Sequence, residues 1–515
     1  MLKFIARRLG ISVLILLGGS LLMFVLTINS GDPIADLREL RDPNRNNLIA
    51  MRIAQMNLEL PWYERYWIWL SGVFGFIPLI NRLPFIPDTG TLGQNRSGAD
   101  VTALLGNAAG ATLRLVIVAT ILAIVIGIAL GIITAVRQYS GFDYAVTFMA
   151  FVFFSLPVFW AAVLLKQYAA IAFNNWLVAP SMSIPTILIT AALFGFVLQL
   201  AMGGSAKRRL YSFGGAAIVV AAAMFYFDAV DWFRQPSVGL PVFILAAIGT
   251  AVLVIVLTTG FGNKRLVRAV GVTTLVGIVL YGVLRGPLLE NPSWAFILGC
   301  LLLTLVVSVV SGVVMGGFSR KVAIQASLIT GTVMAVIAFA DLMMSNWANY
   351  LAIQSRPIPT IGAVTPNLNA PFWPDLIDKA THLLLPTIVL TIISIASYTR
   401  YTRASMLEVM NQDYIRTARS KGLAERKVIT KHAFRNALIP LTTIVAFDFA
   451  ALIGGAVITE TVFGWSGMGE LFRSGLDTVD PAPVMAFYLV TASAAVVMNM
   501  FADIAYAFLD PRITR

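Results

Sequence analysis

The sequence has almost none of the side chains that form disulfides or metal sites. Among 515 residues there are one cysteine, Cys300, and two histidines, His382 and His432. A single cysteine excludes an internal disulfide, and two histidines so far apart in the sequence lack the spacing of metal ligands. We therefore expect no metal site in this chain.

Charged residues are also scarce. They make up 12% of the chain, whereas hydrophobic residues make up 58%, far more apolar surface than one soluble core could bury. The formal net charge of +12 would suggest nucleic-acid binding in a soluble protein. Here, however, lysines and arginines gather in short loops between apolar runs, where the positive-inside rule places them. The composition therefore predicts an all-α polytopic membrane protein with no nucleic-acid partner.

Motifs for nucleotide binding and acyl transfer are missing too. The sequence contains no Walker A pattern, no glycine-rich nucleotide turn after a strand and no nucleophile elbow. The segment Gly-Phe-Gly-Asn-Lys at 260–264 has the wrong glycine spacing for a phosphate loop. We expect no enzyme activity, no catalytic residue and no bound cofactor, so that energy for any transport must come from an ion gradient or from another polypeptide.

Apolar runs of about 20 residues, the length that spans a bilayer, recur through the chain. They lie at 9–28, 113–136, 145–173, 183–202, 213–230, 240–260, 269–289, 293–316, 322–344, 382–403, 438–459 and 483–508. No small-residue cleavage pattern follows the first run, so we interpret it as an uncleaved helix rather than as a signal peptide. These runs predict twelve spans, which place both termini on one side of the membrane.

The loops between these runs alternate in charge. The loops on the side of the N-terminus contain Arg137, Lys207, Arg208, Arg209, Lys264, Arg265, Arg268, Arg320, Lys321, the whole 404–437 segment, Arg512 and Arg515. The alternate loops carry Asp228, Asp231, Glu290, Asp375 and Asp378 with few cations. By the positive-inside rule, both termini are expected to be cytoplasmic. The segment 29–110 contains several arginines on the opposite side, but segments this long are translocated largely regardless of charge.

Two extracytoplasmic segments have recognisable patterns. Within 29–110, residues 46–60 predict an amphipathic helix that ends at Pro61. The aromatic residues at 62–69 that follow are typical of the headgroup level of a membrane, with a ligand-stacking platform as the alternative. Residues 346–381 are rich in proline and asparagine and predict an ordered loop without regular secondary structure.

A basic helix-turn-helix lies between two of the last apolar runs. Between Ser405 and Lys421 the apolar residues recur at every third or fourth position, at Met406, Val409, Met410, Tyr414 and Ala418, which indicates one apolar helix face. Gly422 supplies the backbone freedom that a sharp corner needs, and Glu425 to Asn436 predict a second, strongly cationic helix. We call residues 405–437 the basic elbow. One interpretation is an anchor for anionic lipid; the other is a surface that a cytoplasmic partner grips.

The residues of the basic elbow resemble a known family. Arg-Thr-Ala-Arg-Ser-Lys-Gly at 416–422 and His-Ala-Phe-Arg-Asn-Ala-Leu-Ile-Pro at 432–440 are similar to the coupling loop of permease subunits of dipeptide, oligopeptide and nickel ABC importers. Residues 417–419 stand where the general ABC-permease motif has Glu-Ala-Ala, a departure typical of the peptide branch. In that family the loop inserts into a groove of the cytoplasmic ATPase. The resemblance implies that the ATPase contacts would be Tyr414, Thr417, Ala418, Arg419, Lys421, Gly422, Leu423, Arg426, His432 and Arg435.

Further segments support the resemblance. They are Gly-Asp-Pro at 31–33, Thr-Leu-Arg-Leu at 112–115, Ser-Leu-Pro-Val-Phe-Trp at 155–160, Glu-Thr-Val-Phe-Gly-Trp-Ser-Gly-Met-Gly at 460–469 and Asp-Pro-Arg at 510–512. Ser466 stands where the family has proline. Together the matches cover about residues 1–176 and 357–515. The resemblance implies a second permease subunit, two ATPase subunits that bind ATP and Mg, an extracytoplasmic substrate-binding protein, surrounding lipid, and a bacterial or archaeal cell membrane.

The resemblance also implies a domain organisation. A type I ABC importer core has six helices, so this chain carries about six more. We expect a first helix at 1–28, an extracytoplasmic segment at 29–110, core helices at 111–176, an inserted six-helix bundle at 177–345, an extracytoplasmic loop at 346–381, and the rest of the core at 382–515. Because six is even, the insertion restores the original topology. Its spans contain few ionisable residues away from their ends, which favours a lipid-facing accessory bundle over a second conduit.

Two acidic residues fall inside the core spans. Asp448 lies about 12 Å into its span and Asp503 about 9 Å from the cytoplasmic end, at 1.5 Å per residue. A carboxylate at this depth needs a partner or water, so we expect Asp448 to face the bundle interior. Asp503 lies at a depth similar to Arg400 and Arg403, and we expect an ion pair among these three residues, with substrate contact as the alternative. Gly454 and Gly455 are expected to be packing glycines or a gate.

The expected function is the membrane subunit of an ATP-driven, binding-protein-dependent importer that forms half of a path for peptides. Nickel chelates, glutathione or another small solute are alternative cargoes. An ion-coupled secondary transporter is a rival from another class, but it would show two repeated halves and paired acidic residues at mid-membrane, and neither is evident in the sequence. A membrane scaffold anchored by the basic elbow is the other rival.

Overall fold

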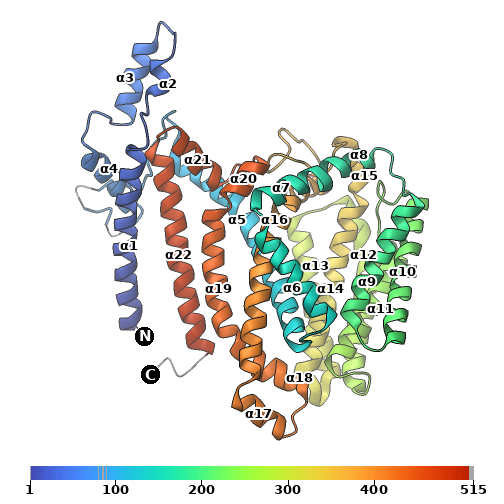
Figure 1. Ribbon diagram of the computed structural model, residues 1–515. Helices are drawn as coiled ribbons and strands as arrows, with labels where there is room; N and C mark the ends of the chain where they lie inside the picture. Colours follow the sequence, from blue (N-terminus) through green and yellow to red (C-terminus); the bar gives the residue numbers. More distant parts are fainter. Residues whose placement is uncertain (1, 79, 84–85, 88–89, 510–515) are drawn as a thin grey trace.

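The computed structural model describes residues 2–78, 80–83, 86–87 and 90–509, without the side chains of 2–6, 8–9, 454–455 and 503–509. The described residues form helices joined by short loops, and only an isolated bridge between Gln94 and Asp100 has extended pairing (Figure 1). The expected all-α polytopic fold is confirmed.

Every expected span is helical. Ten helical stretches in the described residues are long and apolar enough to cross a membrane. One of these stretches contains both α13 (Trp294–Gly316) and α14 (Arg320–Ser345), and a bent pair of helices adds an eleventh. In Figure 1, α1 (Leu2–Ile28) begins and α22 (Pro481–Leu509) ends on the same side of the molecule as α17 (Asp413–Ser420).

The run expected at 145–173 is not one straight helix. It consists of α6 (Gly141–Ser155) and a stretch made of α7 (Val158–Leu165), a π-helix η1 (Lys166–Ala172) and α8 (Phe173–Leu177), with a bend of 102° between them. The bend follows from Pro157, which lacks an N–H and disfavours a helical conformation at Leu156. The motif Ser-Leu-Pro-Val-Phe-Trp is therefore the corner of a broken span. Figure 1 shows α7 and α8 along the upper edge of the molecule.

The core is organised around α5 (Val101–Val136) and α16 (Phe372–Met410). A Cβ atom on Gly127 would lie 2.7 Å from Cβ of Tyr398, and one on Gly131 would lie 2.5 Å from Cβ of Thr402. These glycines are required because the two helices approach more closely than side chains allow. On one side of this pair, α19 (Phe434–Gly455) packs against α22, which packs against α1.

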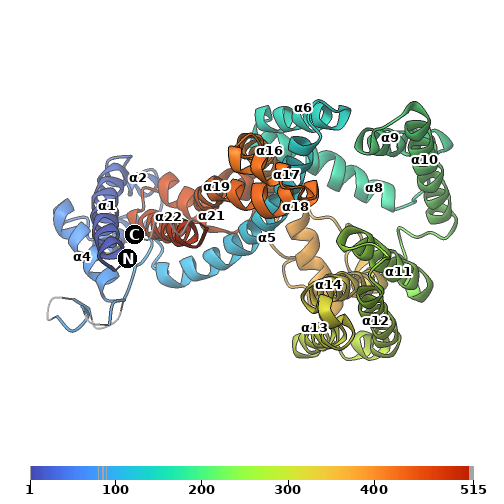
Figure 2. The ribbon, with the colours of Figure 1, turned by 90° about the horizontal axis from the view of Figure 1, so that it is seen from below.

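The insertion at 177–345 was expected to form one six-helix bundle. In the structure its helices form two groups. Helices α9 (Ile184–Met202) and α10 (Ala206–Ala229) form a hairpin that packs on itself and on α6. Helices α11 (Gly239–Thr258), α12 (Lys264–Glu290), α13 and α14 pack on one another. Figure 2 shows the hairpin and this four-helix bundle as separate groups. Within the four-helix bundle, α13 and α14 approach closely at small residues, such as Gly312 against Ile324.

The outer segments contain more helix than the sequence suggested. The expected helix at 46–60 is α3 (Arg45–Gln55), which follows the short α2 (Ala35–Arg38), and the aromatic group forms α4 (Trp62–Phe74). Trp69 packs with Phe24 of α1 and Met485 of α22, whereas Trp62, Tyr63 and Trp67 are exposed.

The segment 346–381 was wrongly expected to lack regular structure. It contains α15 (Trp347–Ile353), and α16 begins at Phe372, ten residues before the expected span at 382. Pro371 precedes the first helical residue and Pro374 lies in the first turn, where a missing N–H costs nothing. The hydroxyl of Tyr350 donates a hydrogen bond of 3.1 Å to the buried Asp378. Prolines that looked like loop residues therefore begin a helix.

A buried carboxylate joins three inserted helices at the ends that lie away from the basic elbow. Asp341 of α14 is fully buried and accepts hydrogen bonds from Tyr281 at 2.7 Å and from Arg285 at 2.8 Å, both on α12. It also accepts the backbone N–H groups of Val238 and Gly239 at the start of α11. The sequence analysis missed this cluster because both ionisable residues lie near helix ends.

Replacing Asp341 with alanine would leave the Arg285 guanidinium and several donors unpaired. We expect the variant to lose roughly 2–4 kcal/mol of stability, measured as a lower apparent melting temperature of the purified protein. Glu290→Ala, an exposed carboxylate at the end of the same helix, is the matched control and should change stability by no more than about 0.5 kcal/mol. Equal melting temperatures for the two variants would contradict the role of the cluster.

Candidate functional site

The basic elbow has the expected corner but different helix boundaries. Helix α16 runs without interruption to Met410, a turn at 411–412 follows, and α17 ends at Ser420. The second helix begins as the short α18 (Glu425–Lys427), continues as a π-helix η3 (Val428–Ala433) and runs directly into α19. The second helix of the elbow is thus continuous with α19, whereas α17 is separated from α16 by one turn.

Gly422 has the conformation that the sequence analysis required. Its φ is +73°, in the left-handed region, and its N–H donates to the carbonyl of Arg419 at 2.9 Å. No atom lies within 4 Å of a Cβ placed on it. Substitution would therefore be limited by backbone strain, about 1–2 kcal/mol for an L-residue, and not by a clash.

The elbow packs through a small apolar core. Met406, Ile415 and Ala418 are buried against Val428, Ala433 and Ala437, together with Ala135 of α5. Ile415, rather than the expected Tyr414, carries the inward face of α17. Tyr414 is 42% exposed and accepts a hydrogen bond of 2.9 Å from Asn436. Ala418 is buried, so it positions the elbow and does not present a side chain to a partner.

Most of the remaining predicted contact residues lie on the outside. Exposed side chains belong to Tyr414, Thr417, Arg419, Lys421, Arg426 and Arg435, and Leu423 and His432 are half-buried. Arg419 donates to Glu425 across the corner at 2.6 and 3.1 Å. Hydrogen bonding to Arg419 lowers the pKa of Glu425, and the same contact raises the pKa of Arg419. Figure 1 shows α17 and α18 projecting below the bundle, so the predicted residues form one projecting cationic surface.

The charged residues inside the core have partners on neighbouring helices. Asp448 accepts hydrogen bonds from Tyr398 at 2.6 Å and from Ser394 at 3.0 Å, both on α16. Arg403 pairs with Asp143 of α6 through two hydrogen bonds of 2.9 Å. The guanidinium of Arg400 lies 4.3 Å from the ring centroid of Phe154. Arg400 and Arg403 therefore have partners other than Asp448, and the expected pairing of these arginines with Asp503 lies outside the described side chains.

Three predicted residues fall where the structure gives no side-chain description. Asp503, Gly454 and Gly455 lie outside the described side chains. Asp143 was not predicted as a site residue. Its position three residues after Ser140, in the first turn of α6, is typical of a helix N-terminus but does not indicate its contact with Arg403. Its carboxylate also accepts the N–H of Tyr139 at 3.0 Å.

The motif at 460–469 forms a second polar centre, on the opposite side from the basic elbow. Glu460, on α20 (Val457–Phe463), is fully buried. Its carboxylate accepts the hydroxyl of Thr112 at 2.5 Å and the N–H of Gly469 at 2.7 Å. A Cβ on Gly469 would lie 2.7 Å from the same carboxylate and 2.5 Å from Cα of Val457. The glycines of the motif therefore leave room for the glutamate, and Thr112 ties it to α5.

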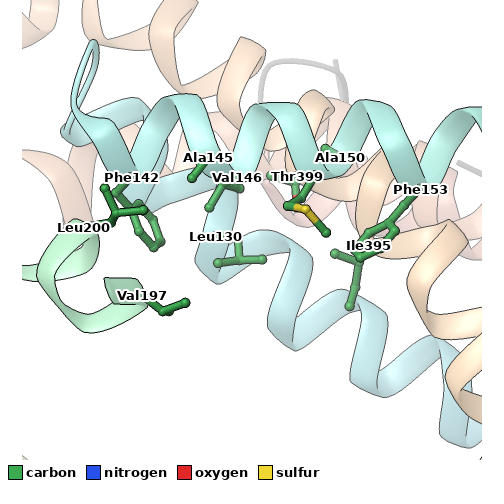
Figure 3. Close-up of a pocket in the computed structure, with 11 residues that line it drawn as sticks. Leu130, Phe142, Ala145, Val146, Ala150, Phe153, Val197, Leu200, Ile395 and Thr399 are labelled. Atoms are coloured by element: carbon green, nitrogen blue, oxygen red, sulfur yellow. The ribbon is translucent and has the colours of Figure 1, made fainter. Parts of the chain in front are cut away.

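A cavity of about 270 Å³ lies where α9 meets the core. It is bounded by α5, α6, α9 and α16, and Figure 3 shows Phe142 and Leu200 at one end and Phe153 and Ile395 at the other. Thr399 is the one residue with a side-chain polar atom among those that line it. Such a lining suits lipid tails and not a charged peptide.

Comparison with known proteins finds a family match in the C-terminal part of the chain. Residues 308–515 match the family model described as "Binding-protein-dependent transport system inner membrane component". The match covers 208 of the 515 residues, less than half of the chain.

Curated relatives agree with the match. The chain is 46% identical over 163 residues to the oligopeptide transport system permease protein AppB of Bacillus subtilis, covering 32% of this chain and 50% of the relative. It is 36% identical over 216 residues to OppB of Mycobacterium tuberculosis, covering 40% and 65%, and 42% identical over 139 residues to the dipeptide permease DppB of Escherichia coli, covering 27% and 41%. The chain thus spans about half the length of the curated relatives it matches.

Gly469→Val tests the close packing around Glu460. The added side chain meets Val457 and the carboxylate, so we expect a loss of roughly 1–3 kcal/mol, as for other overpacked sites, and a lower apparent melting temperature. Gly106→Val on the outer part of α5 is the matched control, since no atom lies within 4 Å of a Cβ there. A control that melts as low as Gly469→Val would contradict this reasoning.

Glu460 also predicts a pH dependence. Burial raises the pKa of Glu460, so the folded state binds this proton more tightly than the unfolded state does. The resulting stabilisation is complete below the ordinary glutamate pKa and is lost as the pH rises through the raised value. We expect Glu460→Gln to flatten the decline of melting temperature with rising pH. Some slope should persist because burial also raises the pKa of Asp480; an unchanged slope would refute the assignment.

Proposed function

We propose that this chain is a membrane subunit of an ATP-driven, binding-protein-dependent importer and forms half of a translocation path for peptides. The observation that carries the proposal is the basic elbow, a projecting cationic surface continuous with α19. A surface of this kind is suited to a cytoplasmic partner, and the match of residues 308–515 to a transport family agrees with it. The chain itself is the non-catalytic subunit, and ATP and Mg would bind to two partner ATPase subunits.

In this proposal the elbow transmits force. From Glu425 to Gly455 the backbone is helical through η3 and α19, so that displacement of α18 would tilt α19 as a unit. Asp448 of α19 is hydrogen-bonded to Tyr398 of α16, which would carry the movement to the central helix pair. Nucleotide and the binding protein would bias two states, open to one side or to the other.

The other partners follow from the same proposal. A second, similar permease subunit would complete the path, and an extracytoplasmic binding protein would deliver substrate to residues 29–110, 345–380 and 460–482. The termini and the elbow would face the cytoplasm of a bacterial or archaeal cell. Peptides are the first choice of cargo because the relatives are named oligopeptide and dipeptide permeases; nickel chelates, glutathione and oligosaccharides are the alternatives.

Co-purification tests the proposal directly. The full chain, expressed with its neighbouring genes and purified in detergent, should retain an ATPase in a fixed ratio. Neither an ion-coupled secondary transporter nor a membrane scaffold requires such a subunit. A chain that transports substrate without any bound ATPase would overturn the proposal.

Gly422→Leu tests the corner in the assembled importer. The strain of about 1–2 kcal/mol at a left-handed position should shift the elbow. We therefore expect ATP hydrolysis to continue while uptake falls at least about tenfold, a change of 1.4 kcal/mol or more, measured in proteoliposomes. Gly214→Leu on α10 is the control, because no atom lies within 4 Å of a Cβ there. Normal uptake by Gly422→Leu would contradict the role of the corner.

A further inference from the structure

Two loops on the elbow side of the inserted four-helix bundle expose phenylalanines. Residues 259–263 join α11 to α12, and the short 3₁₀ turn η2 (Gly317–Ser319) joins α13 to α14. Phe261 in the first loop is 57% exposed, and Phe318 in the second is 99% exposed. An exposed apolar patch that is rimmed by polar residues is typical of an interaction site.

Cations surround both phenylalanines. The first turns of α12 and α14 contain Lys264, Arg265, Arg268, Arg320 and Lys321, and neither 259–268 nor 316–321 contains an acidic residue. The guanidinium of Arg265 lies 4.9 Å from the ring centroid of Phe318, so that the two loops present one surface. We call Phe261, Phe318 and these five cations the insertion tips.

The insertion tips adjoin the basic elbow. Arg426 of α18 donates a hydrogen bond of 3.2 Å to the carbonyl of Thr258, the last residue of α11. Phe261 follows three residues later in the chain. In Figure 1 the lower ends of the inserted helices lie beside α18. A partner that grips the elbow therefore meets the insertion at its edge.

We propose that the insertion tips are a second docking surface for the ATPase that grips the basic elbow, an inference that rests on the proposed function. The ATPase surface that fits them is acidic and has apolar pockets for two phenylalanines. Aromatic and arginine side chains carry much of the energy of protein interfaces. A domain of roughly 200 residues has a radius of gyration of about 16 Å, so an ATPase centred on the elbow overhangs the neighbouring loops.

The contact with the elbow favours a protein partner over the lipid surface. Arg426 of the elbow donates to the carbonyl of Thr258, so the insertion tips lie against the surface that the proposed ATPase grips. Helices α12 and α14, about 40 Å long at 1.5 Å per residue, also place their N-terminal cations at the headgroup level of a membrane. Anionic headgroups also attract cations, and the experiment below separates the two partners.

A photo-crosslinking amino acid placed at Phe261 or Phe318 in the assembled importer tests the proposal. We expect each probe to form a crosslink with the ATPase subunit in anionic proteoliposomes. The matched control is the same probe at Phe194, a 56% exposed residue of α9, which should give lipid adducts alone. A probe at Tyr414 on the elbow reports on the proposed function itself.

The outcomes separate the two proposals. An ATPase crosslink from Tyr414 without one from either phenylalanine would overturn the proposed docking at the insertion tips. The proposed importer function would not be affected. If the probe at Tyr414 forms no crosslink with an ATPase, the proposed importer function is overturned as well. Adducts to lipid alone from Phe261 and Phe318 would assign the tips to the membrane.

Charge reversal adds a quantitative readout. A triple variant carries Lys264→Glu, Arg265→Glu and Arg268→Glu. It should weaken ATPase retention about tenfold, because like charges would face one another across the interface. The control reverses the three cations of the separate hairpin, Lys207, Arg208 and Arg209, and should retain the ATPase as the unaltered chain does. Equal retention by both triple variants would overturn the proposal.

Discussion

The close approach of α5 and α16 is the contact on which the remaining architecture depends. Hydrophobic burial does not drive helices together in lipid, so association relies on close packing and hydrogen bonds. Gly127 and Gly131 allow the backbones to approach, with Tyr398 and Thr402 filling the space that Cβ atoms would occupy. Since α16 has 39 residues, the pair positions α15 and the inserted bundle at one end and the basic elbow at the other.

Buried and half-buried carboxylates extend this framework by joining elements that are distant in sequence. Glu460 links α20 to α5 through Thr112, Asp143 links α6 to α16 through Arg403, and Asp448 links α19 to α16. Each is an acceptor that would be costly to bury alone, so each holds its two helices in one arrangement. Asp448, in addition, joins the helix that continues from the elbow to the central pair, which makes it part of the proposed transmission.

The insertion is attached to the core through polar contacts at its ends. On one side, Trp373 donates to the carbonyl of Leu288 and Trp347 donates to that of Phe233; on the other, Arg426 donates to Thr258. Contacts at both ends of the bundle mean that its position depends on α16 and on the elbow together. A bundle held in this way is placed to respond to the proposed partner of the elbow.

The sequence by itself determined the class of protein, the helical runs, the corner at Gly422 and the projecting cations, because apolar length, charge asymmetry and glycine conformation are local properties. It also marked Pro157, although not that the proline bends a span by 102°. Only the tertiary structure decided that Arg403 pairs with Asp143 and not with Asp448, that the insertion divides into a hairpin and a four-helix bundle, and that Asp341 joins three helices. Those outcomes depend on which helix faces meet in space, and helix periodicity carries no information about the identity of the facing neighbour.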